Sequence, residues 1–461
     1  MPPRFDPQAL RLELSVADLL DTQLLRSLGF AHRGGYERLW LGQAIHSRYQ
    51  EEALERDATY RREVTIRHEL DHRGWRVGIQ GRADGLRRDA DGRRVVEEIK
   101  SIRRGQTLSP TVREVYARQA ALYAWMLARH DLAAASDPEQ VPETVAELVL
   151  IEIGGEDVER QPVEVHLDAL DALVLRRLNG LLRGFRARQE QIAARRDAAE
   201  VLAFPYPERR TGQEAIIDGV GQALEERAHL LVEAPTGLGK TVAALYPALR
   251  AALRDDLKVF VLTAKTLQQD MAMAVASLLN RDGAFRSLRL RAKHKMCAND
   301  QVLCHEEYCP FAREYYAKLQ RSAVVPRLLD THETLLPEFV FDAAVEAEVC
   351  PFEVSLELGG HVQLAVCDYN YAFEPYVSLT EFADDADLSH TVLVIDEIHN
   401  LVDRGRRYYS PTLSSEAARR AAEDVALGGA PIHRQLAALC GQLEQLIYET
   451  VADLQPGRER S

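Results

Sequence analysis

The sequence lacks long apolar runs, an apolar N-terminal leader and any excess of positive charge. Its most apolar stretches, 148–151 and 259–262, are far shorter than the roughly 20 residues that a membrane-spanning helix needs. The opening residues Met1 to Asp6 contain no apolar segment of the kind found in secretory signals. The formal net charge is −14, so the chain as a whole gives no electrostatic reason to bind nucleic acid. These absences predict a cytoplasmic protein without membrane insertion, in which any contact with nucleic acid depends on local patches.

Cysteine is also scarce. Six cysteines in 461 residues are too few for a disulfide scaffold. None precedes Cys297, and four lie between Cys297 and Cys350; such clustering in an intracellular protein indicates a metal site. The hydrophobic content of 46% and the charged content of 28% are those of globular proteins. At about 150 residues per domain, the length predicts roughly three domains.

The N-terminal part shows strand patterns followed by helix patterns. Alternating apolar residues predict β structure over 60–104, 147–153 and 163–167. Apolar residues at spacings of three and four predict a helix over 111–129 and another from Leu170 to Phe185. The basic run from Arg186 to Arg196 follows, and we interpret it as the hinge between two globular units.

A second unit begins near Phe204 with the order strand, glycine loop, helix, strand. The corresponding segments are 230–233, 234–241, 242–253 and 259–263, with a later apolar strand at 391–395. Strands that alternate with helices in this way predict a parallel sheet with helices on its faces.

The strongest motif is A-P-T-G-L-G-K-T at 234–241, between an apolar run and a helical pattern. Its two glycines let the backbone curl so that N–H groups surround a phosphate, and the following helix directs its N-terminus at the same anion. In this pattern Lys240 reaches the β- and γ-phosphates and the Thr241 hydroxyl holds Mg²⁺. The residues that we expect to bind ATP here are Pro235, Thr236, Gly237, Gly239, Lys240 and Thr241.

An acidic pair supplies the complement to this loop. The apolar run 392–395 ends in Asp396 and Glu397. A strand that delivers such a pair beside the phosphates places one carboxylate on Mg²⁺ and the other on the attacking water. We therefore expect Asp396 to hold Mg²⁺ and Glu397 to orient or deprotonate water. The glycine loop and the acidic pair should converge on one bound triphosphate.

Together the two motifs resemble those of superfamily 2 helicases. The resemblance lies in A-x-T-G-x-G-K-T and in D-E-x-H, which ends at His399 and places that residue in the nucleotide site. The segment F-P-Y-P-E-R-R-T-G-Q is similar to the adenine-recognition segment of this family and implies that its last residue, Gln213, reads adenine. T-A-K-T resembles the next helicase motif and implies that Lys265 and Thr266 contact the DNA backbone.

The long segment between the glycine loop and the acidic pair contains a group of four cysteines before residue 351. Six, four and forty residues separate the successive members Cys297, Cys304, Cys309 and Cys350. Four thiolates can hold either tetrahedral zinc or an iron–sulfur cluster, and the loose spacing favours the cluster without excluding zinc. C-P-F and V-C-D-Y-N-Y-A-F-E-P resemble the XPD/DinG group of superfamily 2 helicases, and this resemblance implies a 4Fe–4S domain here. We interpret Cys367 and Cys440 as packing residues.

A basic segment precedes the first of these cysteines. In R-S-L-R-L-R-A-K-H-K at 286–295, basic residues alternate with apolar ones, which would place the charges on one side of an extended segment. Single-strand channels use basic tracks to follow phosphates, but a solvated surface explains these residues nearly as well. In the XPD/DinG group the cluster domain borders the DNA path. The resemblance therefore implies DNA contacts by Arg289, Arg291, Lys293 and Lys295.

Another constellation lies near the N-terminus. G-R-A-D-G places Asp84 at the end of one predicted strand, and E-I-K occupies 98–100 on the next. Residues two apart in a strand share a face, so Glu98 and Lys100 project together while Ile99 points into the core. Asp84 and Glu98 can hold Mg²⁺ or Mn²⁺, which activates water, and a lysine can orient that water. On their own, such residues are also common on surface hairpins.

Further residues strengthen this interpretation. A histidine precedes the pair, and a glutamine and a tyrosine one helical turn apart follow it. The order H, G-x-x-D, E-x-K, Q-x-x-x-Y resembles the RecB-like branch of the PD-(D/E)xK nucleases over about 30–170. The resemblance implies metal ligation by His46, Asp84 and Glu98, action on water by Lys100, and support of the site or DNA contact by Gln119 and Tyr123.

We thus expect an α/β multidomain chain. Its parts are a PD-(D/E)xK nuclease-like α/β domain at 1–168, a helical linker at 169–200 and a first RecA-like P-loop domain at 201–461, with a 4Fe–4S insertion at about 280–360 and the start of an arch insertion at about 403–461. No second glycine-loop domain follows the acidic pair. We expect either a fragment of a longer polypeptide or a motor whose second half comes from another chain.

The expected function is ATP-dependent unwinding of single-stranded or forked DNA, coupled to a Mg²⁺- or Mn²⁺-dependent DNA nuclease, in DNA repair or processing. The resemblance alone implies movement in the 5′ to 3′ direction. Two alternatives stay open: a non-catalytic assembly subunit that binds DNA and nucleotide, and a zinc-bearing ATPase that acts on protein or RNA. On its own, the chain should bind nucleotide and DNA with little or no unwinding.

Overall fold

The computed structural model describes residues 3–20, 22, 35–103, 108–137, 141–154, 158–375, 377–383, 386–410, 412–428 and 430–452, with residues 35–41 and 103 described by their backbone alone. The chain forms two compact units. The first comprises 1–261, 269–367 and 390–394, and the second comprises 262–268, 368–389 and 395–461.

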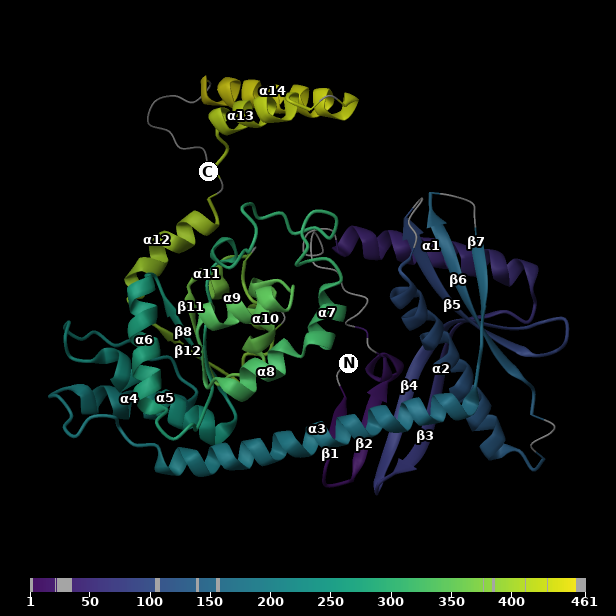
Figure 1. Cartoon of the computed structure of the whole chain (residues 1–461), viewed down its shortest axis with the longest axis horizontal. Coiled ribbons are helices and arrows are strands. Elements are labelled where there is room, and N and C mark those ends of the chain that lie inside the picture. The colour runs from purple at the N-terminus through teal and green to yellow at the C-terminus, as the bar shows by residue number, and fades with distance from the viewer. Residues whose placement is uncertain are drawn as a thin grey trace. The chain divides into compact units, whose positions relative to one another are not determined.

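The N-terminal part of the first unit is a seven-stranded mixed sheet, drawn in purple and blue in Figure 1. Its strand order is β1-β2-β4-β5-β6-β7, and β3 pairs with β4. The strands are β1 (Arg4–Asp6), β2 (Arg11–Ser15), β3 (Arg61–His72), β4 (Trp75–Arg88), β5 (Arg94–Arg103), β6 (Thr144–Ile153) and β7 (Val158–Val163). The strands predicted over 60–104 and 147–153 are confirmed. The strand predicted at 163–167 is misplaced, because β7 ends at Val163 and a helix begins at Leu167.

Helices cover both faces of this sheet. On one face, α2 (Pro110–Ala134) and the first half of α3 (Leu167–Val201) build the main core, in which Leu122, Met126 and Leu178 are fully buried. On the other face, Ile45 and Tyr49 of α1 (Gly35–Arg56) pack against a small cluster on β5 and β6. The helices predicted from the three- and four-residue spacings are confirmed.

Helix α3 joins two cores. Leu170 and Val174 near its start belong to the N-terminal core, whereas Ala199 at its end belongs to the core of the next sheet. Arg188 and Arg195 of the basic run both pair with Asp256, at 2.7 and 3.0 Å. The helix is unbroken through this run, and its role as a hinge between two globular units stays a prediction.

The second sheet has five strands in the order β10-β9-β11-β8-β12. They are β8 (Lys258–Thr263), β9 (Ser287–Arg289), β10 (Thr334–Leu335), β11 (Leu364–Asp368) and β12 (Thr391–Ile395). Strand β9 pairs in parallel with both β10 and β11. The surrounding helices are α4 (Gln213–Glu226), α5 (Lys240–Asp255), α6 (Thr266–Leu279), α7 (Tyr315–Ser322), α8 (Val324–Thr331), α9 (Pro337–Glu346) and α10 (Pro351–Gly359).

The strand predicted at 230–233 is not present. These residues have no regular structure, and the side chain of Leu231 is 80% exposed. This run pairs with no strand of the described sheet. Strands β8 and β12, by contrast, match the predicted segments.

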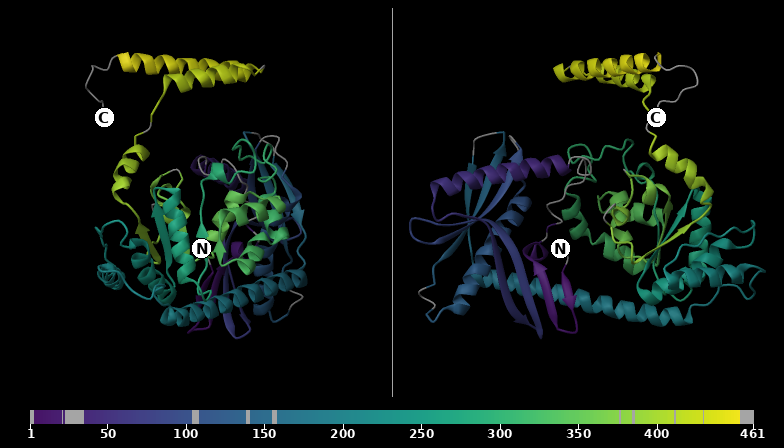
Figure 2. Two further views of the ribbon diagram at one scale, coloured as in Figure 1. Left: turned by 60° about the vertical axis from the view of Figure 1, so that its left-hand side comes forward. Right: turned by 180° about the vertical axis from the view of Figure 1, so that it is seen from behind.

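The second unit contains helices that follow β11 and β12. These are α11 (Asn370–Phe373), α12 (His399–Tyr408), α13 (Ser415–Ala426) and α14 (Pro431–Ala452), and both views of Figure 2 show α13 and α14 side by side as a hairpin. The helical character predicted for 403–461 is confirmed as far as residue 452, and 453–461 lie outside the described residues. None of the described helices has the length and apolar run of a membrane span.

Candidate functional site

The glycine loop leads directly into α5, whose first residue is Lys240. Gly237 and Gly239 have φ angles of 81° and 86°, a left-handed conformation that glycine adopts without steric cost. Lys240 Nζ donates a hydrogen bond to the Ala234 carbonyl at 3.1 Å, so the lysine side chain folds back over the loop. A curled loop followed by a helix N-terminus has the backbone form of an anion-binding site.

Gln213 braces this loop from α4. It is buried, its Oε1 accepts from the Arg210 N–H at 2.8 Å, and its Nε2 donates to the Leu238 carbonyl at 2.8 Å. A Cβ at Gly239 would lie only 2.6 Å from Gln213 Nε2, so this glycine also permits a close approach. Protein atoms therefore engage both ends of the Gln213 amide. Its contact with adenine stays a prediction.

In the second unit, the acidic pair lies on a strained turn after β12. Glu397 has a φ of 51°, which is unfavourable for a residue other than glycine. The Tyr369 hydroxyl donates to the carbonyls of Asp396 and Glu397, the latter at 3.1 Å. Glu397 Oε2 lies 3.4 Å from His399 Nδ1. The sequence pattern did not indicate that Tyr369 holds this turn, although the residue lies in the D-Y-N-Y segment.

The loop predicted to contact DNA also belongs to the second unit. Lys265 and Thr266 are exposed where α6 begins. Arg404 of α12 holds the preceding residue by donating to the Ala264 carbonyl at 3.3 Å, and it donates to Asn370 Oδ1 at 3.0 Å. Arg404 thus holds the backbone of the loop at Ala264, while the predicted contact residues Lys265 and Thr266 are exposed to solvent. Convergence of the acidic pair and the glycine loop on one triphosphate stays a prediction.

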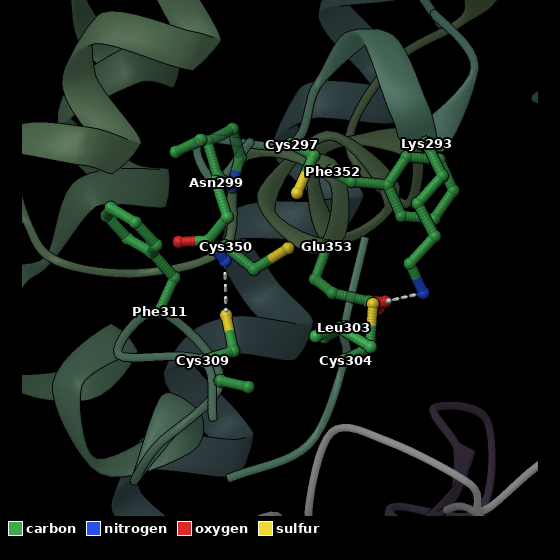
Figure 3. A pocket seen from close by; sticks show the side chains of 13 residues that line it. Lys293, Cys297, Asn299, Leu303, Cys304, Cys309, Phe311, Cys350, Phe352 and Glu353 are labelled. Carbon is green, nitrogen blue, oxygen red and sulfur yellow. Dashed lines mark hydrogen bonds and ion pairs between the residues drawn. The ribbon is translucent and has the colours of Figure 1, made fainter. Parts of the chain in front are cut away.

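The four clustered cysteines line one hollow in the first unit, shown in Figure 3. Asn299 Nδ2 donates to Cys309 Sγ at 3.1 Å, and burial raises the pKa of Cys350 to about 11. The sequence predicts that Cys297, Cys304, Cys309 and Cys350 lie together, and in the structure all four line the same pocket. Of the two other cysteines, Cys367 is fully buried as predicted, but Cys440 is partly exposed, because on α14 only the α13 side is covered.

The predicted one-sided basic track is wrong at its start. Arg289 lies on β9, which is flanked by strands on both sides, and its side chain is 6% exposed and paired with Asp270. Arg291 pairs with Glu338 at 2.8 Å. Lys293 points toward the cysteine hollow, where it lies 3.6 Å from Glu353. Only Lys295 of the four is exposed as the alternation predicted. Arg289 is covered because a strand inside a parallel sheet is covered on both faces.

On the N-terminal sheet, the structure assembles the predicted nuclease-like residues. The Ile99 N–H donates to Asp84 Oδ2 at 2.7 Å, which joins the two strands at this point. Lys100 Nζ donates to Glu98 Oε1, so these side chains share one face as predicted. Ile99 points to the other face, where it is fully buried. Lys100 Nζ also lies 5.1 Å above the ring of Tyr116.

Two polar atoms in this cluster are buried without a hydrogen-bond partner: His46 Nε2 and Glu98 Oε2. Burial lowers the pKa of His46 and raises that of Asp84, and it raises the pKa of Glu98 to about 7 although Lys100 opposes the shift. Burial also disfavours the charge on Lys100, but Glu98 and Asp84 outweigh it and raise the lysine pKa. Buried polar atoms without partners are rare in native proteins. A neutral imidazole and an unpaired carboxylate oxygen are the donors that a divalent cation binds.

Neighbouring residues complete the cluster. Gln119 Nε2 donates to Tyr123 Oη at 3.4 Å, and a Cβ at Gly81 would lie 2.4 Å from Tyr123 Cε1, so the glycine makes room for the tyrosine. Sequence analysis missed Glu63 and Gln50. Glu63 adopts a φ of 53° and its charge acts on His46, Asp84 and Glu98 alike. Among the described residues, no three His, Cys, Asp or Glu side chains form a ready-made metal site.

Two helicase families match the second part of the chain. The DEAD/DEAH box helicase family matches residues 211–303, and the DEAD_2 family matches residues 276–417. The first range contains the glycine loop, and the second contains the cysteine hollow and the acidic pair.

Three known proteins show similarity of limited extent. The chain is 41% identical over 78 residues to the ATP-dependent helicase DinG of Mycobacterium tuberculosis, covering 16% of this chain and 12% of that protein. It is 38% identical over 70 residues to the 3′-5′ exonuclease DinG of Bacillus subtilis, covering 15% and 8%. A solved XPD helicase structure overlaps 55% of this chain and 42% of its own, with 18% identity and a TM-score of 0.38, which is too weak to support an argument. Residues 211–417 therefore match helicase families, and the stretches of 78 and 70 residues that align with DinG proteins span about an eighth or less of those relatives.

Proposed function

We propose that this chain provides the first RecA-like half of an ATP-dependent DNA helicase of the XPD/DinG type, in which ATP binds at the glycine loop. The observation that supports this most directly is the left-handed pair Gly237 and Gly239 at the entry to α5, inside a segment that matches the DEAD/DEAH box family. Lys240 and Thr241 would hold the phosphates and Mg²⁺, and Asp396, Glu397 and His399 would complete the site.

Nucleotide binding tests this proposal. Lys240→Ala should weaken binding of a fluorescent ATP analogue at least about tenfold, the effect of one lost charged phosphate contact. Lys258→Ala is the matched control, since Lys258 begins β8 and lies over the Phe260 ring, 4.6 Å from its centroid. Equal binding by both variants would reject the glycine loop as the ATP site.

The DNA substrate is single-stranded or forked DNA, on which the full motor would move 5′ to 3′. Exposed Lys265 and Thr266 would contact phosphates, and exposed Lys295 would be a further phosphate contact. A second RecA-like half, from the same polypeptide or from another chain, would complete the motor. The chain by itself should bind ATP and DNA; strand separation by the chain alone would contradict this division of labour.

The N-terminal domain is proposed to be a Mg²⁺- or Mn²⁺-dependent DNA nuclease that processes the strands handled by the motor. His46, Asp84 and Glu98 would be the ligands of the cation; two of them present buried atoms without partners, which supports this assignment. A bound cation would supply an activated water. Lys100, held against Glu98, would keep a positive charge beside the scissile phosphate, and Gln119 and Tyr123 would support the site.

Cleavage of labelled single-stranded DNA with Mn²⁺ distinguishes a nuclease from a domain that only holds DNA. Wild type should cut, and Lys100→Ala should reduce the rate by about 100-fold or more, the usual scale for loss of a group that stabilises developing charge. Arg113→Ala is the control, because this arginine pairs with Glu159 at the surface. Equal, negligible cutting by wild type and Lys100→Ala would favour the non-catalytic alternative.

The cysteine hollow is proposed to hold a 4Fe–4S cluster. The support for this is that four thiols line one space, and a 4Fe–4S cluster takes four thiolate ligands; zinc is the competing occupant. Metal analysis and visible absorbance of the purified chain separate the two. Iron with a brown colour, both lost in Cys309→Ser and kept in Cys440→Ser, would support the cluster; zinc without colour would reject it.

A further inference from the structure

Helix α1 carries His46, but little apolar surface holds the helix in place. Among its described residues, Ile45 and Tyr49 pack against a cluster formed by Ile99, Val149 and Ile151. The large core of the domain lies on the opposite face of the sheet. A small apolar contact tolerates sliding of a helix more readily than an interdigitated core does. The place of His46 relative to Asp84 must therefore depend on polar contacts.

One such contact is a closed network of charges behind the candidate site. Glu97 is adjacent to Glu98 on β5, points to the α1 side of the sheet and is 0% exposed. Its Oε1 accepts from Arg87 Nε and from Arg160 Nη1, each at 2.7 Å. The same two arginines bind Glu147 Oε2 at 2.8 and 2.9 Å. Two arginines and two glutamates thus balance each other and fix the register of β4, β5, β6 and β7.

Tyr49 connects α1 to this network. Its hydroxyl accepts from Arg160 Nη2 at 2.6 Å and donates to Glu97 Oε2 at 3.1 Å, so both of its hydrogen-bonding capacities are used. Burial, assisted by Glu97, raises the pKa of Tyr49, and the hydroxyl therefore keeps the proton that it donates. Tyr49 and His46 are three residues apart on one helix and share a face. Gln50 adds a second anchor by donating to the Asp84 carbonyl at 2.9 Å.

We propose that Tyr49 is a positioning residue of the candidate nuclease site: its bonds to Glu97 and Arg160 set the position of α1 so that His46 faces Asp84. The inference rests on the proposed nuclease function. Since Glu97 and Glu98 are consecutive, a helix held on Glu97 is held at a fixed distance from the cation ligand beside it. The tyrosine touches neither DNA nor cation and acts through His46.

A double-mutant cycle on the full chain tests this. Mn²⁺ binding is measured by calorimetry and Mn²⁺-dependent cleavage of single-stranded DNA by gel assay, for wild type, Tyr49→Phe, His46→Ala and the double variant. Tyr49→Phe should weaken Mn²⁺ binding about three- to tenfold, the effect of one lost net hydrogen bond. Tyr60→Phe is the matched control, because the buried Tyr60 hydroxyl has no hydrogen-bond partner; it should bind Mn²⁺ like wild type.

The outcome in the His46→Ala background is decisive. If Tyr49 acts through His46, Tyr49→Phe has no further effect once His46 is gone. A loss of the same size in both backgrounds, or no loss in either, overturns the positioning role while leaving the nuclease proposal intact. Mn²⁺ binding by wild type that is indifferent to Asp84→Asn overturns the proposed metal site, and the positioning role with it.

Discussion

Replacing Lys100 with methionine should make the stability of the N-terminal domain decrease further at alkaline pH. In the wild-type chain, burial raises the pKa of Glu98 from an ordinary value of 4.5 to about 7, and Lys100 is the first group that opposes this rise. Without the lysine, the folded pKa of Glu98 must rise further. A folded pKa above the unfolded one means that the folded state binds more protons. Stability is therefore fully present below about 4.5 and is lost as pH increases toward the folded pKa.

The size of the effect follows from the pH ranges over which the wild type and the variant lose stability. In the wild type this loss ends near pH 7, where folded Glu98 ionises. In the variant it continues, at about 1.4 kcal/mol for each pH unit. Between pH 7 and about 8.5 the variant should lose up to about 2 kcal/mol more than the wild type. At about pH 6 Glu98 is mostly protonated in both folded proteins, so the two slopes are nearly equal and the difference there measures lost packing and the lost Lys100–Glu98 hydrogen bond.

Tryptophan fluorescence is suited to this measurement. All three tryptophans, at positions 40, 75 and 125, lie in the N-terminal domain, so urea unfolding followed by fluorescence in EDTA reports on this domain alone. The difference in unfolding free energy between Lys100→Met and wild type should widen from about pH 6 to about pH 8.5 by up to about 2 kcal/mol. Arg113→Met, which removes a surface ion pair, should show no widening. A constant or shrinking difference would refute the burial of Glu98 against Lys100.

Three further substitutions test other contacts. Gly81→Ala should destabilise the N-terminal domain by about 1–3 kcal/mol, because its Cβ would lie 2.4 Å from Tyr123; Gly180→Ala on α3, with nothing within 4 Å, should instead stabilise it by about 0.5–1 kcal/mol in the same urea titration. Gly239→Ala should abolish binding of a fluorescent ATP analogue, since its φ of 86° and the nearby Gln213 amide leave no room for a methyl group; unchanged affinity would contradict the loop geometry. Tyr369→Phe should speed amide hydrogen exchange in the turn after β12, because that turn loses the hydroxyl that spans its carbonyls, and unchanged exchange would show that the turn is held otherwise.

Sequence patterns correctly predicted the helices and strands whose apolar spacing follows directly from the period of the element itself. Alternation over 60–104 reflects strands with one face in the main core, and the three- and four-residue spacing of Leu170, Val174 and Leu178 reflects the buried side of α3. The E-I-K motif likewise fixes the opposite orientations of Glu98 and Ile99 through the two-residue period of a strand. Each of these inferences needs only the residue's own neighbours in the chain.

The wrong inferences concern residues whose environment is set by segments distant in sequence. The run 230–232 is as apolar as a buried strand, but it is exposed and pairs with no strand of the described sheet. Arg289 alternates with leucines as a surface residue would, yet its side chain is 6% exposed because β9 is an inner strand of a parallel sheet whose faces are covered. Local pattern gives the form of a segment, whereas its burial depends on which segments arrive next to it.

The difference between local pattern and distant contacts also separates the candidate nuclease residues from the residues that hold them in position. His46 was found because its order with the other motifs resembles a family pattern, whereas Tyr49 and Glu97 belong to no motif and lie on the far side of the sheet from Lys100. Their effect depends on Arg160, which reaches Glu97 only because β7 returns antiparallel beside β6. A short motif specifies the atoms that perform chemistry. The positions of those atoms depend on contacts spread over the whole sheet, and such contacts become visible only when the strand order is known.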